Sequence, residues 1–265
     1  MTIQLYQGDC LEVMRGFEPD CIDLTVTSPP YDNLRDYKGY TFDFEPIARE
    51  LYRVTKPGGV VVWVVGDATI HGSETGTSFR HALYFMACGF NLHDTMIYKK
   101  VSGATGSNYS YWQAFDYIFV LSKGKPKTIN LLSDRKNVNA PSVYHGTVGH
   151  RKRNGDRKGK VLRNDKEYGR RLNIWEYHTS DITEYTEHPA QFPEALARDH
   201  ILSWSNPGDL VMDCFLGSGT TGKMAVMYQR NFIGIEISPE YLNGIAKPRI
   251  EQAQAQLSLF TEAQP

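Results

Sequence analysis

VMDCFLGSGTTG, residues 211–222, combines an apolar strand with a glycine-rich loop. The loop matches the pattern G-x-G-x-x-G, in which glycines let the backbone approach a ligand and the following helix N-terminus favours an anionic group. The next predicted strand, NFIGIEI, carries Glu236 at about the separation expected for an acid that contacts a ribose. Strand, loop, helix and acid in this order favour a nucleoside-containing ligand over a merely structural turn. Taken alone, they fit a dinucleotide site.

Asp213 favours a different nucleoside ligand. It lies two residues before Phe215 at the strand end, and so places a carboxylate beside the glycine loop. A carboxylate is awkward for a pyrophosphate but suits an ammonium group. S-adenosylmethionine carries an ammonium, a carboxylate, a ribose and an adenine, and therefore fits better than NAD. A helix-capping or loop-bracing role for Asp213 is the alternative.

The segments around this motif alternate between strands and helices. The apolar spacing of Phe44–Val54 predicts a helix, and the turn KPGG then precedes the buried strand VVVWVV. Further expected strands are residues 3–7, 22–26, 93–100, 116–122 and 210–215, and further expected helices are residues 10–17, 79–88, 193–204 and from about 221. This alternation predicts an α/β fold with a mostly parallel sheet and helices on both faces.

Between residues 123 and 187 the alternation stops and basic residues dominate. From Lys123 to Arg171 there are 15 Lys or Arg against 4 Asp or Glu, so this stretch carries +11 and the rest, given the total of −1, carries −12. Such blocks are often solvated loops, but we favour a polyanion-binding insert within one α/β domain. We therefore expect four parts, residues 1–122, the insert 123–187, residues 188–250 and a C-terminal tail at 251–265.

Length and composition limit the class of protein. A chain of 265 residues suffices for one large α/β domain. The N-terminus, MTIQLYQGD, lacks the features of a signal peptide and the longest purely apolar run is VVVWVV, so we expect a soluble, cytoplasmic protein with no membrane partner. Four scattered cysteines offer no CxxC pair, which argues against a structural zinc site and a disulfide framework. We expect reduced, mostly buried thiols and no metal site.

A second motif gives the chain a family resemblance over nearly its whole length. TSPPY (Thr27–Tyr31) follows the apolar run CIDLTV, and with VMDCFLGSGTTG it resembles the motif pair of amino-directed DNA methyltransferases. TSPPY precedes the basic insert and the glycine motif follows it, which resembles the permuted β class of these enzymes. The resemblance implies a Rossmann-like, circularly permuted methyltransferase fold, S-adenosylmethionine as cofactor, double-stranded DNA as substrate and the insert as target recognition region. It also implies a bacterial, archaeal or phage-infected cell.

Ser28, Pro29, Pro30 and Tyr31 are the catalytic residues that the resemblance implies. An exocyclic base amine is a poor nucleophile, because its lone pair is delocalised into the ring; hydrogen bonds from its N–H groups to fixed acceptors help to localise that pair. A Pro-Pro turn offers rigid carbonyl acceptors at little entropic cost. We expect the Pro29 carbonyl and the Ser28 side chain to hold the amine, and Tyr31 to stack on a flipped base. An ordinary turn with a surface tyrosine is the alternative.

Cofactor contacts follow from the resemblance residue by residue. Asp9 resembles the acid that meets the adenine, Glu236 resembles the ribose-binding acid, and HPAQFPEAL at 188–196 resembles the segment that lines the methionine end. Phe192 stands where many family members have lysine, so the chain departs from the family there. The expected cofactor-binding residues are Asp9, Thr27, Phe192, Asp213, Phe215, Gly217, Ser218, Gly219, Thr220, Thr221 and Glu236.

Basic and aromatic residues are the expected DNA contacts. Arg35, Tyr37 and Lys38 follow TSPPY and are placed to close over the flipped base or its phosphates, with ordinary surface-loop chemistry as the alternative. In the insert, Lys and Arg should bind phosphates while a few side chains read base edges. The candidates in the insert are Arg151, Lys152, Arg153, Arg170 and Arg171.

The target base of the methyl transfer is expected to be cytosine or adenine. Cytosine N3/N4 and adenine N1/N6 present the same adjacent acceptor and donor, so one loop can serve either base. Within the family, serine in the first position of the motif goes mainly with N4-cytosine enzymes, so the resemblance favours cytosine N4 over adenine N6. C5-cytosine chemistry needs a Pro-Cys loop, which this sequence lacks. The rivals from other classes are a NAD-dependent oxidoreductase and a DNA-binding protein without catalytic activity.

The C-terminal tail contains a short segment that suggests a protein partner. QLSLF (Gln256–Phe260) resembles the peptide with which many bacterial proteins bind the replication sliding clamp; docking on the protein's own body is the alternative. A homodimer is also left open. Above all, we expect folding to bring TSPPY and the glycine loop, almost 190 positions apart, side by side.

Overall fold

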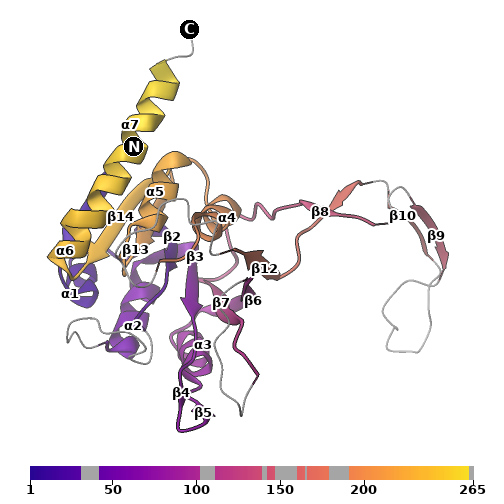
Figure 1. The fold of residues 1–265 in the computed structure, drawn as a ribbon, viewed down its shortest axis with the longest axis horizontal. Helices are drawn as coiled ribbons and strands as arrows, with labels where there is room; N and C mark the ends of the chain where they lie inside the picture. Colours follow the sequence, from indigo (N-terminus) through magenta and orange to yellow (C-terminus); the bar gives the residue numbers. More distant parts are fainter. Residues whose placement is uncertain are drawn as a thin grey trace. The chain divides into compact units, whose positions relative to one another are not determined.

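The computed structural model describes residues 1–30, 42–101, 111–138, 142–146, 160–164, 166–178 and 191–262, with side chains in all of these except 142–146, 160–164 and 258–262. The chain divides into two units (Figure 1). The larger unit comprises Met1–Asn130 and Asn173–Pro265, and the smaller comprises Leu131–Leu172.

An eight-stranded sheet forms the centre of the larger unit, with the order β1-β14-β13-β2-β3-β7-β6-β12 (Figure 1). Its strands are β1 (Ile3–Gln7), β2 (Ile22–Thr27), β3 (Thr55–Val65), β6 (Asn91–Lys100), β7 (Phe115–Ser122), β12 (Ile174–Tyr177), β13 (Leu210–Asp213) and β14 (Asn231–Glu236). Within this sheet β7 pairs antiparallel with β3 and β6, and the other neighbours are parallel. The mostly parallel sheet predicted from the sequence is thus confirmed.

Helices cover both faces of this sheet, as predicted. They are α1 (Cys10–Arg15), α2 (Phe44–Val54), α3 (Thr77–Ala87), α4 (Glu194–Trp204), α5 (Thr220–Met227), α6 (Pro239–Tyr241), the π-helical segment η2 (Leu242–Ala246) and α7 (Lys247–Glu262). Residues of α1, α2 and α3 pack with Val61, Trp63 and Val65 of β3. The alternate residues of β3 are buried on the opposite face, where α5 packs against Phe232 of β14.

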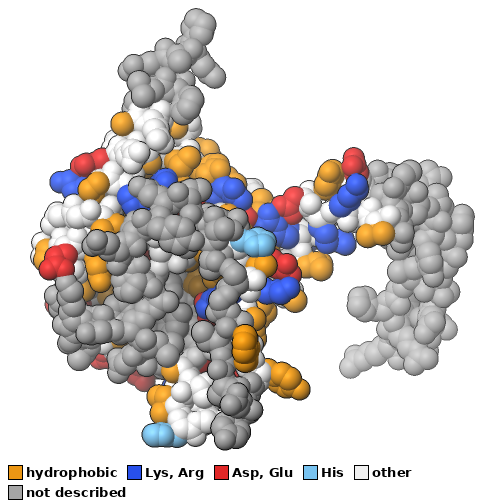
Figure 2. Space-filling model, in the orientation of Figure 1, with side chains coloured by type: hydrophobic (Ala, Val, Ile, Leu, Met, Phe, Trp, Pro, Cys, Tyr) orange, Lys and Arg blue, Asp and Glu red, His pale blue; other side chains and the backbone are white. Residues whose placement is uncertain are grey.

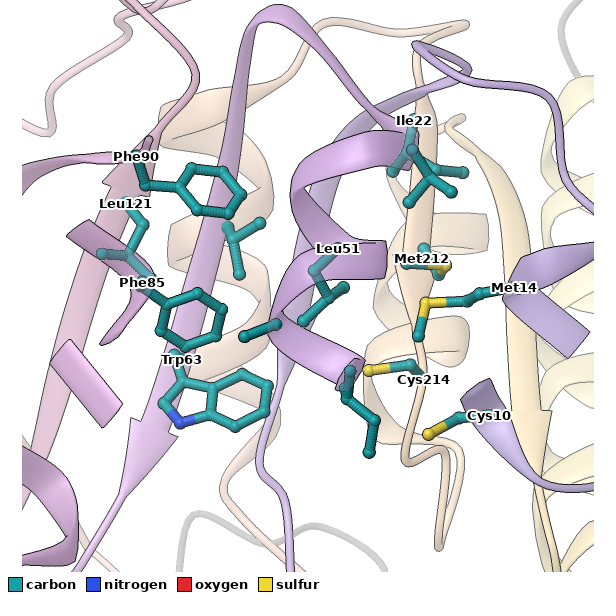
Figure 3. Packing of buried hydrophobic residues seen from close by; sticks show 14 of the residues in the cluster. Cys10, Met14, Ile22, Leu51, Trp63, Phe85, Phe90, Leu121, Met212 and Cys214 are labelled. Atoms are coloured by element: carbon teal, nitrogen blue, oxygen red, sulfur yellow. The ribbon is translucent and has the colours of Figure 1, made fainter. Parts of the chain in front are cut away.

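The buried cluster beneath α1, α2 and α3 joins the two halves of the chain. Met14 of α1 and Leu51 of α2 lie near Met212 and Cys214 of the β13 strand end (Figure 3). Burying large apolar side chains contributes about 1.5–3 kcal/mol each. Residues separated by some 200 positions therefore share one core, which explains why an insert between them leaves the fold intact.

The sequence-predicted segments agree with these elements, with three differences. KPGG at 56–59, predicted as a turn, lies within β3 (Thr55–Val65), whose pairing with β2 shifts in register between Ile22 and Leu24. Ile174–Tyr177, which lay inside the predicted insert, forms β12 and pairs with β6 at the edge of the main sheet. The expected C-terminal tail continues as the helix α7 to Glu262. A short hairpin of β4 (Thr69–Ile70) and β5 (Ser73–Glu74) precedes α3.

Among its described residues, the smaller unit contains two antiparallel strand pairs. These are β8 (Arg135–Lys136) with β11 (Tyr168–Gly169), and β9 (Ser142–Gly146) with β10 (Lys160–Asn164). The unit, Leu131–Leu172, spans fewer residues than the predicted insert at 123–187. Lys127 donates its N–H to the Gly58 carbonyl at 2.9 Å, so the chain immediately after β7 stays with the main sheet.

Candidate active site

The site is built where the strand order reverses. From β2 the chain runs through α2 to β3 on one side, and from β13 it runs through α5 to β14 on the other. β2 and β13 are parallel neighbours, with Val211 opposite Leu24. Open α/β sheets bind ligands outside the carboxyl ends of the strands at such a switch point. Thr27 of TSPPY ends β2 and Ser28–Pro30 follow it, while the glycine loop follows β13, so both motifs leave the sheet at this edge.

A direct hydrogen bond joins the two motifs. The Thr27 hydroxyl donates to Asp213 Oδ1 at 2.6 Å, although the residues are 186 positions apart. The Thr221 hydroxyl, at the start of α5, donates to the Val26 carbonyl of β2 at 3.2 Å. The expected proximity of TSPPY and the glycine loop is therefore confirmed.

The glycine loop has a backbone that L side chains rarely adopt. Gly217 and Gly219 have φ of 50° and 77°, in the left-handed region. A Cβ at Gly219 would lie 2.9 Å from Ala246 Cα, and a Cβ at Gly222 would lie 2.5 Å from Ile250 Cδ1. The loop is thus packed directly on the C-terminal helical segment.

Glu236 orders the loop from the end of β14. Its Oε2 accepts the Gly217 N–H at 2.8 Å and its Oε1 accepts the Ser238 N–H at 2.9 Å. Burial raises the pKa of the Glu236 carboxyl, and these hydrogen bonds lower it in part. Each oxygen keeps a further lone pair for a ligand donor.

Asp213 is an almost completely buried carboxylate, with 1% of its surface exposed. Burial raises its pKa to about 6, while hydrogen bonds from the Thr27 hydroxyl and the Phe215 N–H act in the opposite direction. Asp213 therefore also braces the start of the loop through its hydrogen bonds, as the alternative interpretation expects. A carboxylate held this way is also ready to accept a hydrogen bond from a cation placed beside it.

Asp9 caps α1 at the neighbouring strand end. Its Oδ1 accepts the N–H groups of Leu11 at 2.9 Å and Glu12 at 3.2 Å. The preceding Gly8 donates its N–H to the Glu236 carbonyl at 3.0 Å. Asp9 thus follows the end of β1, which pairs with the end of β14 at Glu236, and Asp9 is exposed.

The catalytic candidates are described in part. Ser28 and Pro30 are half-buried and Pro29 is buried, directly after Thr27. Tyr31 and the expected DNA contacts Arg35, Tyr37 and Lys38 lie outside the described residues, as do Arg151, Lys152 and Arg153 of the insert.

An aromatic cluster, which the sequence reasoning missed, connects the segment after TSPPY to the glycine loop. Phe42 is the first described residue after 31–41, and its ring lies 5.7 Å from that of Phe215. Trp63 of β3 also contacts Phe215, at 6.1 Å, and donates its Nε1–H to Nδ1 of His81 at 3.2 Å. Ring contacts between distant elements leave no local sequence signal, so they could not be predicted.

Phe192 and the residues after it lie at the start of α4. Phe192 is half-buried and Pro193 is buried. Glu194 then accepts hydrogen bonds from Lys223 of α5 at 2.8 Å and from Arg249 of α7 at 3.1 Å. Glu194 and Arg249 were not predicted, because each becomes recognisable only through its distant partner.

The expected DNA contacts of the smaller unit differ in their surroundings. Arg170 is exposed, and its carbonyl accepts the Arg135 Nε–H at 3.1 Å. Arg171 is half-buried and forms an ion pair with Asp134, so its guanidinium braces the unit. Figure 2 shows Lys and Arg side chains alternating with acidic and hydrophobic ones on the described part of this unit.

Cysteine chemistry does not fit the site. All four cysteines are free, and Cys214, beside the glycine loop, donates a weak hydrogen bond to the Thr27 hydroxyl at 3.8 Å. Burial raises the pKa of the Cys214 thiol well above its ordinary value, and that of Cys10 to about 12. Neither thiol is thus a thiolate nucleophile near neutral pH.

The described part of the chain shows neither a metal-ligand cluster nor a membrane-spanning helix. Within the described ranges, no group of three His, Cys, Asp or Glu side chains is arranged to hold a metal ion. No helix in the described part of the chain has the length and apolar character needed to cross a membrane.

The chain is similar to known DNA methyltransferases along most of its length. The N6_N4_Mtase family model, described as DNA methylase, matches residues 22–248. The orphan methyltransferase M.BamHII of Bacillus amyloliquefaciens is 57% identical over 242 residues, which cover 88% of this chain and 90% of that protein. The DNA adenine methyltransferase YhdJ of Escherichia coli (strain K12) is 28% identical over 90% of this chain and 79% of that protein.

A solved structure determined in complex with SAM is similar in fold. The M1.HpyAVI–SAM complex superimposes with a TM-score of 0.60 at 25% identity, and the match covers 94% of this chain and 100% of that chain. The chain therefore belongs to the N6_N4_Mtase family of DNA methylases, whose cofactor is S-adenosylmethionine.

Proposed function

We propose that the protein methylates the N4 amino group of cytosine in duplex DNA. The observation that carries this proposal is the Thr27–Asp213 hydrogen bond, because it ties the strand end before Ser28 to the strand end before the glycine loop. Serine in the first position of the motif supports cytosine over adenine. The cytoplasm of a bacterial, archaeal or phage-infected cell is the matching location.

The hydrogen-bond donors and acceptors at the carboxyl ends of β13 and β14 match those of S-adenosylmethionine. Asp213 offers a buried carboxylate for the ammonium group, and Glu236 offers the remaining lone pairs of its carboxylate to ribose hydroxyls. Gly217 and Gly219 leave the loop free of side chains, so a ligand can approach the backbone. Asp9 completes the set at the adenine end, and Phe192 with Phe215 adds apolar surface.

Ser28 and Pro29 position the target amine. The Ser28 side chain and the Pro29 carbonyl accept its two N–H groups, which localises the nitrogen lone pair toward the methyl donor. S-adenosylmethionine supplies the electrophilic methyl group: a carbon–nitrogen bond forms as a carbon–sulfur bond breaks. The surplus proton of the methylated amine, held by one of these acceptors, leaves to water. Because the acceptors are fixed before the reaction, little reorganisation is needed.

The remaining residues bind the DNA. Tyr31 stacks on the flipped base, and Arg35, Tyr37 and Lys38 close over it or its phosphates. The insert contacts the duplex, with phosphate contacts from its Lys and Arg side chains and base contacts from a few of them. Among the insert candidates the exposed Arg170 suits a phosphate contact better than the ion-paired Arg171.

Adenine N6 is the second candidate. The similarity to YhdJ, named as a DNA adenine methyltransferase, favours it. The same Ser28 and Pro29 acceptors can hold the adenine amine, since both bases present an acceptor beside the amino group. Family membership removes the support that the glycine loop alone lent to a NAD-dependent oxidoreductase.

Nucleoside mass spectrometry distinguishes these functions. Unmethylated genomic DNA is treated with the protein and isotopically labelled S-adenosylmethionine, digested and analysed. We expect labelled N4-methylcytosine, and roughly 10- to 100-fold slower labelling by Ser28→Ala, because a hydrogen bond to the reacting amine is lost. Labelled N6-methyladenine would establish the second candidate. DNA binding without labelled nucleosides, unaltered in Ser28→Ala, would indicate a non-catalytic DNA-binding protein.

A further inference from the structure

Arg249 of α7 binds the backbone of the glycine loop through its guanidinium group. Its Nη1 donates to the Ser218 carbonyl at 2.5 Å and lies 3.5 Å from the Thr220 hydroxyl oxygen. The side chain is 4% exposed, so these are buried, charge-assisted hydrogen bonds. Ser218 itself is buried in the loop between the two left-handed glycines.

The same guanidinium also holds the start of α4. Arg249 Nη2 donates to Glu194 Oε1 at 3.1 Å, and Lys223 of α5 donates to the same oxygen at 2.8 Å. Glu194 directly follows Phe192 and Pro193. One arginine therefore fixes the glycine loop and the segment at 191–194 relative to each other.

The packing of the C-terminal segment makes the loop depend on it. Ala246 of η2 occupies the space that a side chain at position 219 would need, and Ile250 does the same for position 222. Short π-helical segments often occur at functional sites. With Arg249 one turn further along, the helical segment packs directly against the glycine loop.

We propose that Arg249 is a positioning residue for S-adenosylmethionine, acting through Ser218 and Glu194. The proposal rests on the cofactor role proposed above for the glycine loop. A solely stabilising arginine would lower stability without a specific effect on cofactor affinity. The chain contains such a comparison: Arg230 is equally buried and donates to the carbonyls of Ser205 at 2.6 Å and Tyr228 at 2.5 Å, with no bond to the glycine loop in the described residues.

The test compares Arg249→Met with Arg230→Met in the full-length protein. The dissociation constant of S-adenosylmethionine is measured by calorimetry well below the Tm of each variant. We expect Arg249→Met to weaken binding at least about tenfold, since hydrogen bonds from a charged group are lost, and to raise KM for the cofactor much more than it lowers kcat. Arg230→Met should lower Tm while changing affinity less than about twofold. Wild-type affinity in folded Arg249→Met, or an equal loss in Arg230→Met, would overturn the proposal.

Milder variants keep the test decisive if Arg249→Met does not fold. Arg249→Lys can reach Ser218 or Glu194 but cannot bridge both, so we expect an intermediate affinity. Glu194→Gln combined with Arg249→Lys should weaken binding by less than the product of the single effects, because both act in one network. Independent, multiplicative effects would contradict the shared network.

Glu236→Ala separates this inference from the proposed function. Unchanged S-adenosylmethionine binding in Glu236→Ala would show that the cofactor site itself is misplaced. Weakened binding in Glu236→Ala together with wild-type binding in the Arg249 variants would overturn the role of Arg249 alone.

Discussion

At the scale of single residues, Thr27 is the contact on which the site depends. Its hydroxyl is completely buried and donates to Asp213. Thr27→Val keeps the side-chain shape but leaves the carboxylate with one donor fewer. We expect unfolding free energy to fall by about 1–3 kcal/mol in urea titrations. The methyl-transfer rate should fall as well, because Ser28 is the next residue.

Thr25 of the same strand is the matched control. Its hydroxyl is also buried but has no hydrogen-bond partner among the described residues. Thr25→Val should therefore be neutral or slightly stabilising. Equal effects of Thr25→Val and Thr27→Val on stability and rate would show that the Thr27–Asp213 bond has no special role.

Asp213 predicts a pH dependence. Burial raises its pKa from 3.8 to about 6, so the carboxyl group holds its proton to a higher pH in the folded protein than in the unfolded chain. The stability contribution of this proton is fully present below about pH 4 and is lost as the pH rises through about 6. Asp213→Asn should therefore be more stable than the wild type by roughly 3 kcal/mol above pH 7, and similar in stability near pH 4.

The affinity for S-adenosylmethionine should depend on pH in the opposite sense, because it requires the ionised carboxylate. Ionised Asp213 is the form that attracts an ammonium group, so the affinity of the wild type for S-adenosylmethionine should fall as the pH drops through about 6. Glu236, whose pKa burial also raises, contributes to the same trend. Calorimetry at several pH values checks this. An equally steep pH dependence of affinity in Asp213→Asn would assign the effect to Glu236 instead.

At the scale of elements, the glycine loop depends on both its backbone conformation and its contact with η2. Gly219→Ala adds a left-handed alanine, which costs about 1–2 kcal/mol, and a contact of 2.9 Å with Ala246. Gly208 also has positive φ, 88°, but no atom lies within 4 Å of the position that a Cβ would take there. Gly208→Ala should thus cost the conformational strain alone. Thermal unfolding should rank Gly219→Ala as clearly less stable, with weaker cofactor binding.

Similar Tm values for the two alanine variants would indicate that η2 yields to the added methyl group. In that case the loop would not depend on the C-terminal helical segment for its conformation.

The elements that the sequence predicted are those with a strong local pattern. Phe44–Val54 is a helix with the expected bounds, because its apolar spacing is unambiguous, although the turn expected at 56–59 lies within β3. Ile174–Tyr177 also alternates between exposed and buried residues, but four residues are too few to distinguish a strand from a loop. α7 was missed because its Gln- and Ala-rich sequence carries only a narrow apolar stripe, Ile250, Ala253 and Leu257; packing on the glycine loop stabilises its start.

The site divides in the same way. The positions of the glycines, Asp213 and Glu236 at strand ends were predictable because motif and strand end coincide, while their contacts with a cofactor stay predictions. The contacts of Arg249, Phe42 and His81 arise from residues far apart in sequence, and no local pattern encodes them. The cap that Asp9 provides and the ion pair of Arg171 add structural roles to residues expected to bind ligands.

The insert should act as an electrostatic element. We expect DNA affinity to fall steeply with salt, and Arg170→Ala to weaken binding similarly across sequences and reduce the salt slope by about one. Arg171→Ala should instead destabilise the unit, because its ion pair with Asp134 is lost. Fluorescence anisotropy at several salt concentrations measures the slopes. A salt-independent affinity would contradict the assignment of the insert.

At the scale of the whole molecule, sliding-clamp binding and a homodimer stay predictions. Gln256–Phe260 lies in the C-terminal part of α7, and the side chains of residues 258–260 are outside the described ones. If the segment docks on a clamp, Leu259→Ala with Phe260→Ala should abolish the affinity measured by calorimetry. Unchanged affinity would exclude it as the docking peptide. Sedimentation velocity tests the homodimer.

A crystal structure with S-adenosylhomocysteine and a duplex substrate tests most directly whether the ends of β2 and β13 form one active site. We expect the ribose hydroxyls on Glu236, the amino-acid group beside Asp213, and the amine of a flipped cytosine within hydrogen-bond distance of Ser28 and the Pro29 carbonyl. A cofactor bound away from the glycine loop, or a flipped base that contacts neither Ser28 nor Pro29, would contradict the proposed enzyme.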